Sequence, residues 1–174
     1  MAAINPAPGG ETRTEPRKQK ITTFLWFDNN AEEAAAFYVS VFKNSRILRT
    51  ARYPEGSPAP PGTVMVVDFE LDGQSFSALN GGPHFKFTEA VSLVVHCKDQ
   101  EEVDYYWEKL TADGGQESQC GWLKDKYGFS WQITPDSLLN VWTDGDPAKA
   151  QRVMQAMMGM KKIIIKDIEA AAAG

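Results

Sequence analysis

The order of apolar and polar residues predicts a strand followed at once by a helix near the start of the chain. Residues 21–27 are rich in aromatic and β-branched side chains, which favour a strand. In Ala31–Phe42, apolar residues recur at helical spacing, with Phe37 and Val41 on one face. An Asp/Asn cluster precedes this stretch and two glutamates open it, which is typical of a helix N-terminus. The pattern therefore predicts a β-strand and a capped helix.

The same order returns later in the chain. Residues 91–96 form a second β-rich stretch, and residues 98–107 supply a polar cap, paired glutamates and an aromatic pair. A shift of 69 residues places Thr23 on Ser92 and superimposes the two helices. Three further strands are predicted in each half: 45–53, 64–71 and 74–79, and then 115–119, 121–126 and 129–134. The chain is therefore predicted to be an α+β protein built from a duplicated βαβββ unit.

These patterns divide the chain into four parts within one integrated domain, residues 21–174. We expect a disordered tail at 1–20, a first module at 21–89, a second module at 90–135 and a C-terminal extension at 136–174. In the extension, Asp146 followed by Pro147 predicts a capped helix that runs to Met158. Residues 162–165 suggest a short edge strand, and residues 167–173 suggest a last helical turn or two.

Composition excludes several classes of protein. The chain has 43% hydrophobic and 24% charged residues and a net charge of −5, which argues against nucleic-acid binding. Its apolar runs are too short for a membrane span, and residues 1–20 lack the apolar core of a secretory signal. We therefore expect a cytoplasmic protein without nucleic-acid or membrane partners. Cys97 and Cys120 have no zinc-type spacing and are expected to be free, buried thiols, although a disulfide between them stays open.

Several motifs resemble the PhnB-like branch of the vicinal oxygen chelate superfamily (glyoxalase/bleomycin resistance/dihydroxybiphenyl dioxygenase). The resemblance covers about residues 21–170. Its motifs are FY at 37–38 with VF at 41–42, LNGGP at 79–83 with FKF at 85–87, EEVD at 101–104, CGWLKD at 120–125 with YG at 127–128 and WQ at 131–132, and AMM at 156–158 with MKK at 160–162. The resemblance implies the glyoxalase fold, in which each module curls its strands into a half-barrel cup that holds a ligand.

The resemblance also implies where a metal would lie, on inward-facing residues of the first and fourth strand of each module. Those positions fall on Thr23 and Ser77 in the first module and on Ser92 and Gln132 in the second. Hydroxyl groups are poor ligands for zinc, nickel or iron, and only Gln132 would be acceptable. We therefore expect no metal and no other cofactor, unless the alignment is displaced by two residues.

The two histidines leave other chemistry open. His84 lies on a loop after the fourth strand, where the mouth of the cup is expected, and His96 ends the strand that contains Ser92. His84 could line the mouth, join His96 in a rearranged metal site, or have no role. Asp68 and Glu70 could act as bases, although a solvent-facing side of their strand is favoured.

The leading hypothesis is a protein that binds a small organic molecule. We expect Thr23, Ser77, Ser92 and Gln132 inside the cup, with His84, Phe85, Trp122 and Trp131 near its mouth. The alternatives are a divalent-metal-dependent glyoxalase, lyase or oxygenase that uses a histidine, and an interaction module with a methionine-rich helix. The methyltransferase (demethylubiquinone) label of the branch has no support, because no glycine-rich strand-to-helix turn is present. The resemblance also implies a homodimer, with module pairing either within one chain or between two.

Overall fold

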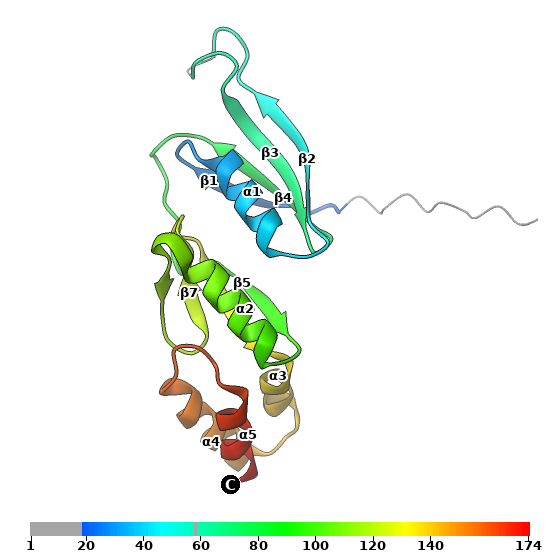
Figure 1. Cartoon of the computed structure of the whole chain (residues 1–174), viewed down its shortest axis with the longest axis vertical. Helices are drawn as coiled ribbons and strands as arrows, with labels where there is room; N and C mark the ends of the chain where they lie inside the picture. Colours follow the sequence, from blue (N-terminus) through cyan, green and yellow to red (C-terminus); the bar gives the residue numbers. More distant parts are fainter. Residues whose placement is uncertain (1–18, 58) are drawn as a thin grey trace, which may run out of the picture.

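A computed structural model describes residues 19–57 and 59–174 and shows two four-stranded sheets, each with its own helix (Figure 1). The strands of the first sheet are β1 (Thr23–Phe27), β2 (Arg46–Arg52), β3 (Val64–Leu71) and β4 (Gln74–Asn80). They lie in the order β1-β4-β3-β2, and only β1 and β4 run parallel. Helix α1 (Ala31–Val41) packs on β3 and β4.

The second sheet repeats this plan with shorter strands. Its strands are β5 (Ser92–Cys97), β6 (Gln116–Glu117), β7 (Trp122–Lys124) and β8 (Ser130–Pro135), in the order β5-β8-β7-β6. Helix α2 (Gln100–Thr111) packs on β7 and β8, and a 3-10 turn, η1 (Ala112–Gly114), follows it. The predicted α+β fold with a duplicated βαβββ unit is therefore confirmed.

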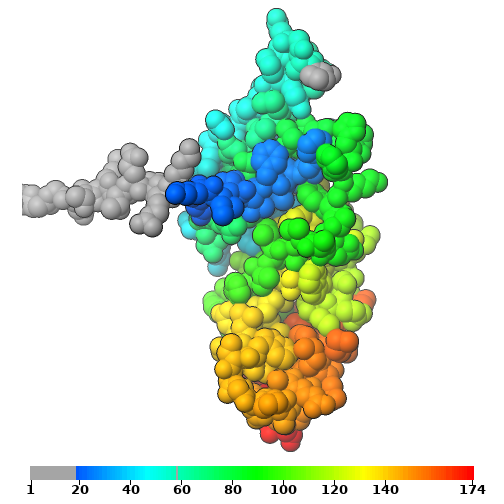
Figure 2. Space-filling model, turned by 180° about the vertical axis from the view of Figure 1, so that it is seen from behind, coloured from blue at the N-terminus to red at the C-terminus, as the bar shows by residue number. Residues whose placement is uncertain are grey.

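Each sheet has one covered face and one open face, because successive side chains on a strand point to opposite sides. Leu25, Phe27, Phe69 and Ala78 are buried on the face that α1 covers. We call the other face of each sheet its open face. On the first sheet it carries Phe24, Trp26, Asp68, Glu70, Ser77 and Leu79, and on the second Ser92, Val94, His96, Trp122, Gln132 and Thr134. Figure 2 shows the molecule from behind, with residues of β1 (blue) at the surface.

A buried carboxylate joins the two modules. Asp125, in the turn after β7, is 2% exposed. Its Oδ2 accepts hydrogen bonds from Tyr38 Oη of α1 at 2.7 Å and from Trp131 Nε1 of β8 at 2.8 Å, and its Oδ1 accepts from the backbone N–H groups of Tyr127 and Phe129. Burial raises the pKa of the Asp125 carboxyl, although these four donors oppose that rise. One side chain thus fixes a turn and ties it to the helix of the other module.

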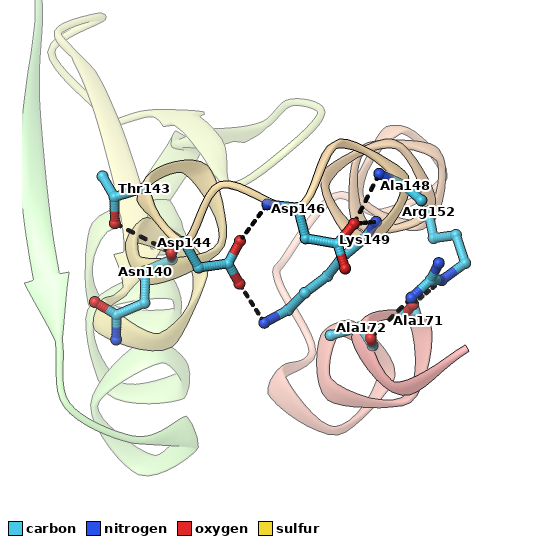
Figure 3. Close-up of polar contacts among 9 residues, drawn as sticks. All are labelled: Asn140, Thr143, Asp144, Asp146, Ala148, Lys149, Arg152, Ala171 and Ala172. Carbon is cyan, nitrogen blue, oxygen red and sulfur yellow. Dashed lines mark hydrogen bonds and ion pairs between the residues drawn. The ribbon is translucent and has the colours of Figure 1, made fainter.

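The C-terminal extension forms three helices with a core of their own. They are α3 (Asp136–Thr143), α4 (Pro147–Met158) and α5 (Ile165–Ala173). Asp146 caps α4 as predicted, accepting hydrogen bonds from the backbone N–H groups of Ala148 and Lys149 (Figure 3). Arg152 of α4 donates to two carbonyl groups at the end of α5, where a cation is favourable.

Two expectations change and one helix was missed. The predicted strand at 162–165 is wrong, because residues 162–164 are irregular, Ile165 begins α5 and Ile163 is buried in the core of the extension. Helix α3 was not predicted. Cys97 is a buried free thiol as expected, whereas Cys120 is free but only half-buried. The expected tail lies outside the described residues, except for positions 19 and 20. No helix within the described parts of the chain is both long and apolar enough to cross a membrane.

Candidate functional site

The centre of the first open face is a row of four side chains, one from each strand. Backbone pairing sets Phe24 of β1 beside Ser77 of β4, Ser77 beside Asp68 of β3, and Asp68 beside Arg49 of β2. Ser77 Oγ donates to Asp68 Oδ1 at 2.7 Å, and Arg49 donates to Asp68 Oδ2 through Nε at 2.9 Å and Nη2 at 2.6 Å. Phe24 closes the row with 57% of its surface exposed.

This row refines one expectation and adds a residue. Asp68 and Glu70 were expected on a solvent-facing side of their strand, and they lie on the open face, which also carries Ser77. Asp68 is only 22% exposed in its side chain because Ser77 and Arg49 cover it. Arg49 was not predicted. The alternation of apolar and polar residues through 67–71 could have indicated which face carries Asp68. Its partner on β2 could not be predicted in this way, because the strand register shifts between Ile47 and Arg49.

The second open face has a matching row. Val94 of β5 lies beside Gln132 of β8, and Gln132 lies beside Trp122 of β7. Gln132 Nε2 donates to Ser92 Oγ at 2.8 Å. The structure therefore brings together three of the predicted site residues, Ser92, Trp122 and Gln132. They form a neutral surface with hydroxyl, amide and indole groups.

Two other predicted residues lie on the covered faces instead. Thr23 shares a face with Leu25 and Phe27, and its partner across the sheet is the buried Phe76. Trp131 is 2% exposed and contacts Tyr38 and Phe42 in the core, so it is not at the mouth of a cup. Adjacent residues on a strand point to opposite faces, so Trp131 lies on the covered face while its neighbour Gln132 lies on the open face, and Thr23 lies on the covered face while Phe24 lies on the open face.

The error at Thr23 has a physical origin in the strand-to-helix connection. Two residues separate Phe27 from the helix cap Asn30, whereas one residue separates Cys97 from the cap Asp99. The helices therefore match with a shift of 69 residues but the strands match with a shift of 70. The shift of 70 aligns Phe27 with Cys97, which are both buried. On the open faces the shift of 70 aligns Phe24 with Val94, whereas the shift of 69 had aligned Thr23 of the covered face with Ser92 of the open face.

His84 and Phe85 lie at one end of the first sheet, beside a cavity of about 930 Å³. Trp26 forms one wall of it and donates through Nε1 to the carbonyl oxygen of Gly82 at 2.8 Å. Phe85 packs edge-on against Trp26, with ring centres 4.9 Å apart. His84 and Leu79 also line the cavity. Of the predicted site residues, only His84 lines this cavity, so its place at the mouth of a cup stays a prediction.

The residues present do not fit a metal of the kind the superfamily binds. His84 belongs to the end of the first sheet, and His96 lies on the second sheet, where its Nδ1 is 3.8 Å from Asp136. On the open faces, the first and fourth strands place Phe24 beside Ser77 and Val94 beside Gln132, and Ser92 also contacts Gln132. Of these side chains only the Gln132 amide is an acceptable ligand. Among the residues that the structure describes, no three His, Cys, Asp or Glu side chains gather in a way that could hold an ion.

Comparison with solved structures gives one relative at 43% sequence identity. It is described as a putative 3-demethylubiquinone-9 3-methyltransferase, PhnB protein, from Bacillus cereus, with a TM-score of 0.62 over 67% of this chain and 99% of that chain. Two more distant structures share the fold. Protein PA1353 from Pseudomonas aeruginosa is 16% identical with a TM-score of 0.56, covering 68% of this chain and 98% of that one. The fosfomycin resistance protein FosX from Listeria monocytogenes is 15% identical with a TM-score of 0.52, covering 71% and 96%.

The family model that matches residues 19–134 is described as 3-demethylubiquinone-9 3-methyltransferase. The match ends before the extension, so the motifs at 156–162 lie outside it. No curated protein matches this chain. The description is the name of a family and does not assign methyl transfer to this chain. By the family match and the 43% identity to the Bacillus cereus protein, the chain belongs to this family, the PhnB-like branch of the vicinal oxygen chelate proteins.

Proposed function

We propose that this protein binds a small organic molecule on the open faces of its two sheets. The observation that carries the proposal is the central row of each face, where hydrogen-bonding groups lie beside exposed apolar side chains. In the first row Ser77 and Asp68 lie next to Phe24, and in the second Gln132 lies between Val94 and Trp122. Small-molecule sites combine apolar surface with a few fixed polar groups in this way. The cytoplasmic location stays a prediction from composition.

A screen of aromatic fragments by thermal shift tests this function. At least one fragment is expected to raise the melting temperature of the full chain, because a ligand that binds only the folded state stabilises it. The Gln132→Leu/Trp122→Ala variant is expected to lose that response. Thr143→Ala, on the exposed part of the extension, serves as the control and keeps it. A fragment that stabilises all three proteins equally would place binding elsewhere and contradict the proposal.

The open faces also support a homodimer in which two copies complete the cup. Phe24 and Val94 stay 57% and 42% exposed in the single chain, and each lies on the edge strand of its sheet, β1 or β5, beside the central polar residue of the neighbouring strand. Exposed apolar side chains on a sheet face are a common feature of interfaces. Pairing between an open face of one copy and an open face of the other would cover them and enclose a ligand.

The dimer gives a direct prediction for Val94→Glu. A charge at this position would be buried without a partner in the dimer, so the variant is expected to elute as a monomer. Light scattering coupled to gel filtration measures the mass, which for the unaltered protein is expected to be twice the 19.3 kDa of the chain. Met158→Glu, on the 64% exposed Met158 of α4, is the matched control and keeps the dimer mass. A dimeric Val94→Glu protein would refute pairing through the second open face.

A further inference from the structure

Arg49 presents hydrogen-bond donors on the first open face that have no partner in the described part of the chain. Its Nε and Nη2 atoms both donate to Asp68 Oδ2, so one edge of the planar guanidinium faces that carboxylate. Its Nη1 atom has no hydrogen-bond partner within residues 19–57 and 59–174, and its side chain is 73% exposed. The other edge, formed by Nη1 and Nη2, is therefore free to bind a second planar oxyanion.

Contacts with neighbouring side chains fix the direction of the Arg49 guanidinium. Asp68 is itself fixed by Ser77, whose Oγ donates to Asp68 Oδ1 at 2.7 Å. This chain of contacts runs along one row of the sheet, so the direction of the guanidinium is set by three strands. A pre-positioned donor loses less conformational freedom when it binds a ligand than a free surface arginine does.

Resting on the proposed small-molecule site, we propose that the ligand is an apolar ring system that carries a carboxylate, and that the free edge of Arg49 binds this carboxylate. Phe24 lies at the other end of the same row and offers its exposed face to that ring. Trp26 and Leu79 are directly opposite each other in the next row on this face, about 7 Å away at the usual rise of a strand. Both line the cavity of about 930 Å³, which is large enough for a modest organic molecule.

The charges that line this cavity set the direction of the ligand. They are those of Asp28, Glu32 and Arg52, whose Nη1 donates to the carbonyl oxygen of Gly62. Two carboxylates against one guanidinium make the cavity unfavourable for an acid. The carboxylate of the ligand therefore belongs at Arg49, and its ring system points toward Trp26.

Binding of 2-naphthoate and of its neutral amide, 2-naphthamide, to the full-length protein tests this inference. Titration calorimetry is expected to show that the unaltered protein binds the acid about tenfold more tightly than the amide, as one charge-assisted bidentate contact would give. In Arg49→Ala the two affinities are expected to fall within about twofold of each other. Arg49→Gln, which keeps the length of the side chain but not the charge, should give the same result.

Arg46 offers a matched control on the same strand. It pairs with Glu70 at 2.9 Å and is 68% exposed, so Arg46→Ala removes an equivalent surface ion pair without touching the central row. This variant is expected to keep the preference for the acid. Three results would overturn the inference. They are equal affinities of the unaltered protein for the acid and the amide, an equal loss of the preference for the acid in Arg46→Ala and Arg49→Ala, and no binding of either compound. A neutral fragment that still binds through Gln132 and Trp122 would show that only this inference fails, and not the proposed function.

Discussion

Replacing Asp125 with alanine is expected to lower the melting temperature by roughly 10 °C, from a loss of about 4 kcal/mol in the free energy of unfolding. Four donors lose their acceptor in this variant: Tyr38 Oη, Trp131 Nε1 and two backbone N–H groups. Tyr38 is fully buried and Trp131 is 2% exposed, so water reaches their polar atoms only if the core opens. Thermal unfolding followed by circular dichroism measures the change.

A graded set of variants separates the lost hydrogen bonds from the lost volume. Tyr38→Phe removes only one donor and leaves the carboxylate with three, so its melting temperature is expected to fall by a smaller amount. Asp125→Asn keeps one acceptor oxygen and is expected to lie between Tyr38→Phe and Asp125→Ala. If all three variants melt within about 1–2 °C of the unaltered protein, the hydrogen bonds to Asp125 contribute little to stability, and Asp125 does not join the modules.

Gly81→Ala is expected to lower the free energy of unfolding by about 2 kcal/mol, which is the usual cost of forcing atoms into a filled space. A Cβ atom on Gly81 would lie 2.3 Å from the ring of Trp26, too close for any contact. The ring would have to move, which breaks its hydrogen bond to the Gly82 carbonyl group and its contact with Phe85. Trp26 fluorescence and the melting temperature report the two effects.

The cause can be checked by making the opposing ring smaller. In the Gly81→Ala/Trp26→Phe variant the six-membered ring leaves room for the new methyl group, so the two substitutions together should cost less than the sum of their separate effects. Gly82→Ala is a useful contrast, because the nearest atom to its Cβ is at 3.6 Å and the strain comes from a φ of +86° alone. Strictly additive losses in the double variant would show that Trp26 does not define the space at Gly81.

Much of the fold could be predicted because the repeat is visible in short-range sequence patterns. The strand-helix pairs and the Asp146 cap depend on neighbouring residues, and both are found as expected. The helix α3 and the irregular segment around Ile163 depend instead on packing within the extension. In that core Ile163 contributes a buried side chain without forming a strand.

The site was harder to predict, because a shift of one residue along a strand moves a side chain from one face of the sheet to the other. Because one extra residue lies between Phe27 and Asn30, matching the helices placed Thr23 on Ser92, although Thr23 lies on a covered face and Ser92 on an open face. The row of Ser77, Asp68 and Arg49 brings together residues of three strands that are far apart in the chain. The irregular register of β2 prevents its prediction from sequence alternation. Ser77 and Gln132 lie on the open faces of equivalent strands, because β4 and β8 match with a shift of 55 residues, and Gln132 also contacts Ser92.

Mapping where fragments bind tests the central claim, that the open faces form the ligand site. Amide and indole ¹H–¹⁵N spectra of the full chain would be recorded with each aromatic fragment that raises the melting temperature. We predict that the largest shifts fall on the central rows, at Phe24, Ser77, Val94 and Gln132, and on the indole N–H of Trp122. Shifts confined to the extension, or to the covered faces around α1 and α2, would contradict the account.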